Sequence, residues 1–127
     1  MMQNRIFSGA PSEDFAGYAK AVIAGPTIYV SGTLGQDPAT GTLPESAADQ
    51  TRNALASIGA ALTQAGASLA DAVACRVYIT DKSVLRDVAT VLGETFREIR
   101  PTNTLLICQI PTDGAKVEIE LTAWRAA

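Results

Sequence analysis

The hydrophobic period changes along the chain, and this change limits the fold to a combination of strands and helices. Within residues 72–79 apolar and polar side chains alternate, as in a strand with one buried face. The predicted inward side comprises Val73, Cys75, Val77 and Ile79, and the outward side Arg76 and Tyr78. A second alternating run, 117–123, places Val117, Ile119, Leu121 and Ala123 opposite Glu118, Glu120 and Thr122. These two runs predict a sheet with one apolar face.

Two other segments have helical spacing. From residue 45 to 65, apolar side chains recur every three or four positions, and Gly66 is a typical helix stop. These side chains are Leu55, Ile58, Ala61, Leu62 and Ala65. A second helix is predicted to begin near Asp81 or Ser83 and to carry Leu85, Val88, Leu92 and Phe96. It ends before Pro101, because the residue preceding a proline avoids helical backbone angles.

Shorter segments complete the order of elements. Strands are predicted at 5–7, 20–25 and 27–32, with Gly25-Pro26 as a tight turn between the last two. Residues 32–44 contain several Gly and Pro residues and are predicted as a loop. A further strand carries Thr104, Leu106, Cys108 and Ile110 on one side, and a loop at 111–115 leads to the last strand. The predicted order is β-β-β-α-β-α-β-β.

This order favours one α+β domain over residues 1–127, as the chain length of 127 residues also does. The simplest architecture is a two-layer sandwich, a mixed sheet with both helices on one face. The other face is polar on some strands and apolar on others. Because a small domain rarely leaves such a face in water, we expect oligomerisation to cover it.

Composition excludes several kinds of function. The chain has no histidine, which removes Ser-His-Asp and Cys-His catalysis and the commonest metal ligand. Its two cysteines form no close-spaced metal motif, so we expect no metal site. The net charge of −3 lacks the basic excess typical of nucleic-acid or membrane-surface binding. The chain shows neither a membrane-spanning run nor a signal-peptide pattern, and we therefore expect a cytoplasmic protein.

Three polar side chains are candidates for chemistry, and each has an ordinary structural alternative. Tyr18 precedes the second strand and could be a half-buried aromatic with its hydroxyl in solvent. Ser31 ends the third strand and could serve only as a strand exit. Glu118 could belong to a solvated strand edge that it shares with Lys116 and Glu120. The residues alone therefore indicate a small α+β domain, oligomeric through its open face, without a defined activity.

Four segments together resemble the YjgF/Rid family, named for reactive intermediate deaminase. They are GYAKAV (17–22), IYVSGTLGQDPATG (28–41), QTRNALASIGAALTQAGASLADAVACRVYITD (50–81) and PTNTLLICQIPTDGAKVEIE (101–120). The most specific features are the strand ending in VSG before a P-x-T-G loop, the AG-x-x-L-x-D-V-like junction and the closing VEIE strand. The resemblance covers nearly the whole chain, from about residue 3 to about residue 125.

The resemblance implies a chorismate-mutase-like α+β fold and a homotrimer whose sheets face one another around a central barrel. It also implies three clefts at subunit interfaces, where family members hydrolyse enamines and imines such as 2-aminoacrylate to 2-keto acids and ammonia. No bound cofactor is needed. This fits a chain without histidine, because an iminium carbon is already electrophilic and a positioned water with a carboxylate can suffice.

Four residues match family site positions. Tyr18 matches the cleft tyrosine and Ser31 the serine at the strand exit. Gly32 matches the following glycine, where a side chain would crowd the bound ligand. Glu118 matches the glutamate associated with the attacking water and is therefore the predicted catalytic residue.

Four further positions depart from the family pattern or leave alternatives open. Asn103, or Thr102 if the alignment slips by one, stands where deaminating members carry an arginine that grips the substrate carboxylate. Thr33 changes the wall of the same site, because those members commonly have SGQ there. Arg100 is the neighbouring residue that could replace the missing charge. Cys108 is either a small core or barrel residue or a thiol at the cleft.

Two functions follow as hypotheses. The first is a trimeric deaminase, a hydrolase in which Glu118 positions water while Tyr18, Ser31 and Asn103 orient an imine that differs from 2-aminoacrylate. The second is a non-catalytic trimeric module whose cleft binds a metabolite as a sensor or scaffold. Ribonuclease activity, a label that some family members carry, is disfavoured by an acidic chain without histidine or a basic stripe.

Overall fold

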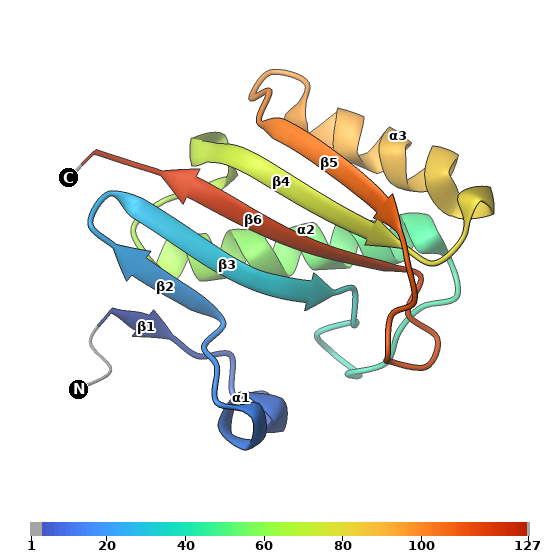
Figure 1. Ribbon diagram of the computed structural model, residues 1–127, viewed down its shortest axis with the longest axis horizontal. Helices are drawn as coiled ribbons and strands as arrows, with labels where there is room; N and C mark the ends of the chain where they lie inside the picture. The colour runs from blue at the N-terminus through green and yellow to red at the C-terminus, as the bar shows by residue number, and fades with distance from the viewer. Residues whose placement is uncertain (1–3, 127) are drawn as a thin grey trace.

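The computed structural model describes residues 4–126 and folds them into two layers, a six-stranded sheet with two long helices behind it (Figure 1). The strand order is β1-β2-β3-β6-β4-β5. The strands are β1 (Arg5–Ile6), β2 (Ala21–Ala24), β3 (Thr27–Leu34), β4 (Ala72–Ile79), β5 (Thr102–Ile107) and β6 (Val117–Trp124). The helices are α1 (Pro11–Ala16), α2 (Ala47–Gln64) and α3 (Leu85–Phe96), with short 3₁₀ turns at Leu69–Asp71 and Lys82–Val84.

The sheet is mixed. Four strand pairs are antiparallel, and β4 and β5 run parallel because α3 crosses over between them. The α+β fold, with a mixed sheet and both long helices on one face, is therefore confirmed. The short helix α1 was not predicted, since its six residues PSEDFA have no apolar period. It lies beyond one end of β2, beside the sheet rather than behind it (Figure 1).

The core lies between the sheet and helices α2 and α3. The inward side of β6 is fully buried, as its alternation predicts. From α2, Ile58 and Leu62 pack against this layer, and Val88 and Val91 do so from α3. These apolar contacts pack one face of the sheet against the two helices, and the helices leave its other face uncovered.

Strand β4 departs from the predicted alternation at its start. Val73 is 46% exposed, whereas Ala72 is buried. The register between β4 and β6 shifts between Ala72 and Ala74, which is the mark of a β-bulge. The extra residue turns Val73 outward, so its predicted core position is wrong, while Cys75, Val77 and Ile79 face the core as expected.

Strand β5 is shorter and more exposed than its sequence predicts. It begins at Thr102 and ends at Ile107, so Cys108 and Ile110 lie beyond it. As an edge strand, β5 has only β4 as a neighbour, and Leu106 and Ile107 are both more than half exposed. Cys108 is also exposed, which makes its interpretation as a core residue wrong for the single chain.

A buried amide fixes the loops at one end of the sheet. The Nε2 of Gln50 donates to the carbonyls of Pro44, at 2.8 Å, and Gly114, at 2.9 Å. Its Oε1 accepts from the backbone N–H of Lys116 at 2.9 Å. These three bonds satisfy a fully buried polar side chain and set where β6 begins.

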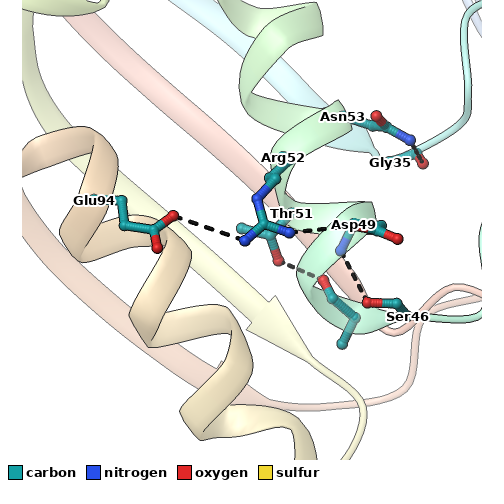
Figure 2. A network of polar contacts seen from close by, with 8 residues as sticks. Gly35, Ser46, Asp49, Thr51, Arg52, Asn53 and Glu94 are labelled. Atoms are coloured by element: carbon teal, nitrogen blue, oxygen red, sulfur yellow. Dashed lines mark hydrogen bonds and ion pairs between the residues drawn. The ribbon is translucent and has the colours of Figure 1, made fainter.

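Polar contacts also orient α2 against β3 and α3 (Figure 2). Asn53 donates a hydrogen bond of 3.1 Å to the carbonyl of Gly35, just after β3. Arg52 lies 3.2 Å from Asp49 on its own helix and 3.8 Å from Glu94 on α3. These ion pairs are exposed, and each is worth about 0–1 kcal/mol, so packing rather than charge holds the helices together.

The face of the sheet turned away from the helices carries both aromatic and charged side chains. Tyr29, Leu106 and Trp124 are each about half exposed on this side, beside Arg76 and Glu120. We call this surface the open face. In the described part of the chain, no helix has the length and apolar character needed to cross a membrane.

Candidate functional site

On the open face, Gly32 of β3 lies directly against the Glu118 side chain of β6. A Cβ on Gly32 would lie 2.7 Å from the Oε2 of Glu118, which is too close for two atoms without a bond. The register of β3 and β6 shifts between Val30 and Thr33, and this bulge brings Gly32 under the carboxylate. Glycine is therefore required for Glu118 to hold its position.

Ser31 directly precedes Gly32, and the segment that follows Tyr18 contacts Ser31. The hydroxyl of Ser31 donates to the carbonyl of Ala19 at 2.6 Å, and its backbone N–H donates to the carbonyl of Lys20 at 2.9 Å. The segment after Tyr18 is thus hydrogen-bonded directly to Ser31. The prediction that Ser31 ends the third strand is wrong, because β3 continues to Leu34. The phenol oxygen of Tyr18 lies 2.6 Å from the hydroxyl of Ser12 on α1. The structure therefore brings Ser31, Gly32 and Glu118 together, and it connects Tyr18 to them only through the backbone of Ala19 and Lys20, while the phenol of Tyr18 contacts α1.

The position of Tyr18 depends on a buried carboxylate in α1 that sequence reasoning missed. Glu13 accepts hydrogen bonds from the N–H groups of Ser8, at 3.1 Å, and Gly9, at 3.3 Å, and from the Ser8 hydroxyl at 2.5 Å. Burial alone would raise the pKa of Glu13, but these hydrogen bonds lower it overall. This carboxylate holds the short helix against the chain that precedes it, and so it helps to set the position of Tyr18, which follows the helix.

Glu118 has the electrostatic character expected of a general base. Burial raises its pKa above the usual carboxyl value, and the negative charge of Glu120 two residues away raises it further. Glu120 itself is engaged, because it accepts a hydrogen bond from Tyr78 and lies 3.3 Å from Arg76. Arg76 also donates to the hydroxyl of Thr122 at 3.3 Å. Of the two carboxylates, Glu118 is therefore the one without an ion pair among the described residues.

Thr33 does not share the open face. It is buried on the helix side of β3, where its hydroxyl accepts from Lys20 Nζ at 2.7 Å and donates to the Ser31 carbonyl at 2.8 Å. Lys20 also donates to Ser57 of α2 at 3.1 Å. Burial lowers the pKa of Lys20 to about 8, although Glu13 opposes this effect. A lone lysine before the apolar run AVIA was the only sequence signal for this contact.

Asn103 lies apart from Glu118 in the same chain. It pairs with Cys75, and Cys75 pairs with Leu121, three residues beyond Glu118. Two strand spacings and three residues place the two Cα atoms about 14 Å apart. Asn103 also faces the helix side, where it lines a cavity of about 410 Å³ between α3 and β5. The two predicted site residues therefore cannot touch one molecule from a single copy of the chain.

The two cysteines occupy different environments. Cys75 is buried in the core, and burial raises the pKa of its thiol to about 11. Cys108 is exposed just after β5, where its N–H donates to the carbonyl of Ile79 at 2.9 Å. Cys108 therefore lies beside the end of β4, at the edge of the sheet. Among residues 4–126, no three His, Cys, Asp or Glu side chains gather as a metal ion would require.

This arrangement can support hydrolysis of a polarised carbon. A carboxylate with a raised pKa can accept a proton from water, and the Glu118 carboxylate lies against Gly32, next to Ser31. The absence of a side chain at position 32 gives the Glu118 carboxylate its place.

Comparisons with known proteins agree with this architecture. Residues 9–125 match the family model described as Endoribonuclease L-PSP. A curated relative from Capra hircus, named 2-iminobutanoate/2-iminopropanoate deaminase, is 34% identical and covers 94% of this chain and 88% of its own. A crystal structure of a YjgF/YER057c/UK114 family member from Mycobacterium tuberculosis is 40% identical, with a TM-score of 0.87 over 94% of this chain and 97% of that one. Escherichia coli TdcF with bound serine is 28% identical, with a TM-score of 0.81 over 99% and 97% of the two chains.

Proposed function

The chain belongs to the Endoribonuclease L-PSP family, the YjgF/Rid family, and on this basis we propose that it is a hydrolytic deaminase of reactive enamine or imine metabolites. The observation that carries the proposal is the position of the Glu118 carboxylate against Gly32 on the open face. The name of the goat relative, a deaminase of 2-imino acids, supports the reaction class.

The reaction follows from the chemistry of one carboxylate. Water attacks the iminium carbon while Glu118 accepts a proton from it, and Glu118 then returns this proton to the nitrogen. As the C–N bond breaks, its electron pair leaves with the nitrogen as ammonia, and Glu118 accepts the hydroxyl proton so that the carbon becomes a ketone. The raised pKa of Glu118 makes it a stronger base than an exposed glutamate.

The active unit requires more than one copy of the chain. Glu118 and Asn103 lie on opposite faces of the sheet, about 14 Å apart, so they act on one substrate only if different copies supply them. The open face carries half-exposed Tyr29 and Trp124, which a second copy would cover. We infer a homotrimer with a cleft at each interface.

The substrate differs from 2-aminoacrylate in this proposal. Asn103 has no charge, and a neutral amide binds a carboxylate with about half the strength of an arginine fork. Asn103→Arg is therefore expected to improve turnover of the small imine. A larger imino acid should gain nothing from the same change.

A coupled assay tests the proposal. A pyridoxal-phosphate dehydratase supplies 2-aminoacrylate, and an amino acid oxidase supplies larger 2-imino acids from leucine and phenylalanine. Release of keto acid and ammonia well above the rate in buffer supports the deaminase. A ligand that binds and is recovered chemically unchanged, with every imine decaying at the buffer rate, would instead favour a metabolite-binding module.

A further inference from the structure

The cavity between α3 and β5 is lined by both apolar and cationic side chains. Its volume of about 410 Å³ lies within the range of small-molecule sites. The larger apolar residues that line it are Leu85, Leu92, Phe96 and Leu105. Its charged residues are Arg97 and Arg100, and Asn103 also lines it. A cavity of this composition suits a ligand with an apolar part and an anionic part.

The Arg97 guanidinium lies against Gly93, one turn earlier in the chain. A Cβ on Gly93 would lie 2.8 Å from the Nη2 of Arg97, so the guanidinium occupies the space that a side chain at Gly93 would fill. Glycine within a helix lowers the unfolding free energy by about 0.5–1 kcal/mol relative to alanine. The guanidinium has no carboxylate within 4.0 Å in the described part of the chain, and its charge is available to a ligand.

Arg100 is held by the turn that joins α3 to β5. Its φ of +59° is the one positive value among the described non-glycine residues. This left-handed conformation is unusual for a long side chain and is typical of positions that the surrounding structure determines. The Nε of Arg100 donates to the carbonyl of Arg97 at 2.7 Å, and its backbone N–H donates to that of Phe96 at 2.8 Å. Among residues 4–126, the terminal nitrogens of Arg100 have no hydrogen-bond or carboxylate partner, so they can bind an anion.

We propose that Arg97 and Arg100 bind the carboxylate of the substrate and replace the charge that Asn103 does not supply. The ligand class is a 2-imino or 2-keto carboxylate whose aliphatic or aromatic side chain contacts Leu92 and Phe96. This inference rests on the proposed function only in assigning the ligand as substrate, with Glu118 of a second copy acting on its reactive carbon. Guanidinium groups bind carboxylates through charge-assisted hydrogen bonds, often two at once.

Binding of a stable product analogue tests the inference without any turnover. Isothermal titration calorimetry compares 4-methyl-2-oxopentanoate with its neutral amide, 4-methyl-2-oxopentanamide, on the wild-type protein. We expect the acid to bind at least about tenfold more tightly than the amide, since a charge-assisted bond is lost. Arg97→Gln and Arg100→Gln should each weaken binding of the acid by about tenfold, and the amide should be unaffected.

Two further variants separate binding from a structural role of the arginines. Arg86→Gln removes the same charge from α3 but does not line the cavity, so it should leave the affinity for the acid unchanged. Gly93→Ala should move the Arg97 guanidinium and weaken binding while keeping or raising the melting temperature. An arginine that only stabilised the end of α3 would change the melting temperature and spare the affinity.

The outcomes distinguish the two proposals. Equal affinity for acid and amide, no binding of the acid, or unchanged affinity in the double variant Arg97→Gln/Arg100→Gln would each overturn the role of the arginines. Arginine-dependent binding of the acid without release of ammonia from the matching imine would overturn the deaminase alone. Deamination that the double variant retains at wild-type KM would overturn the arginine site alone.

Discussion

Glu118 and Asn103 lie on opposite faces of the same sheet, separated by strand β4. Glu118 stands above Gly32 on the open face, while Asn103 lines the cavity beneath α3. If both residues belong to the proposed site, this separation means that two different copies of the chain must supply them.

Mixing two impaired variants tests this requirement. Glu118→Gln removes the base, and Asn103→Asp places a negative charge where a substrate carboxylate binds. If each site takes one residue from each of two copies, refolding the variants together at equal concentration leaves about a quarter of the interfaces intact. We expect a corresponding recovery of deaminase activity. Activity no greater than the mean of the two variants would mean that one copy builds the whole site.

Gly32→Ala should impair catalysis more than stability. The backbone φ of Gly32 is not in the left-handed region, so alanine fits the chain, but its Cβ would push the Glu118 carboxylate from its position. We expect kcat to fall at least about tenfold with a loss of no more than about 1 kcal/mol of unfolding free energy. Gly59→Ala on α2 is the control and should keep full activity, since its Cβ would meet Leu69 at an ordinary 3.7 Å.

Activity should decline in acid at a pH above 4.5. Glu118 must be ionised to accept a proton, and burial followed by the charge of Glu120 raises its pKa above that value. Activity is therefore lost as pH falls through the raised pKa. Glu120→Gln should move this decline to lower pH in a kcat profile. A decline that stays in place would show that another group controls the rate.

Stability should rise with pH in the alkaline range through Lys20. Its folded pKa of about 8 lies below the ordinary 10.5, so between these values the unfolded chain binds more protons than the folded one. The unfolding free energy contributed by Lys20 therefore increases from about pH 8 to about pH 10.5. Denaturant unfolding of wild type and Lys20→Met across this range gives the difference. Parallel stability curves would argue against the buried position of the amine.

Gly35→Ala tests the packing that supports the site. A Cβ there would lie 1.9 Å from the backbone oxygen of Gln50, which cannot move without shifting α2. We expect a loss of about 3 kcal/mol of unfolding free energy, measured by chemical denaturation. A loss below about 0.5 kcal/mol would mean that β3 and α2 are not held at this distance.

The periodic parts of the fold were predictable, and the irregular parts were not. The alternation in β6 correctly predicted that Ile119 and Leu121 face the core, because in a strand with one buried face every second side chain points to that face. Val73 was wrongly predicted to face the core, because a β-bulge adds a residue to the strand and the alternation of the sequence does not predict the bulge. Helix α1 was not predicted because its conformation depends on the contacts between the buried carboxylate of Glu13 and Ser8, which only the structure shows.

The candidate site divides in the same way. Ser31, Gly32 and Glu118 come from neighbouring strands, and a correct strand order brings them together. Asn103, or Thr102 with a shift of one residue, was assigned to a cleft between subunits from resemblance. The side of an edge strand on which each residue lies depends on register, which one residue can reverse. The roles of Arg97 and Gly93 had no sequence signal, because glycine within a helix is equally compatible with close helix packing or a nearby helix end.

The most direct test of the proposed function is the rate of keto-acid release from 2-imino acids by Glu118→Gln. The isosteric amide keeps the contact with Gly32 but cannot accept a proton from water. We predict a kcat at least about a hundredfold below wild type, with the oligomer intact by light scattering. Glu45→Gln, which changes an exposed carboxylate, should match wild type. A Glu118→Gln protein that turns over imines at the wild-type rate would contradict the assignment of Glu118 as the base.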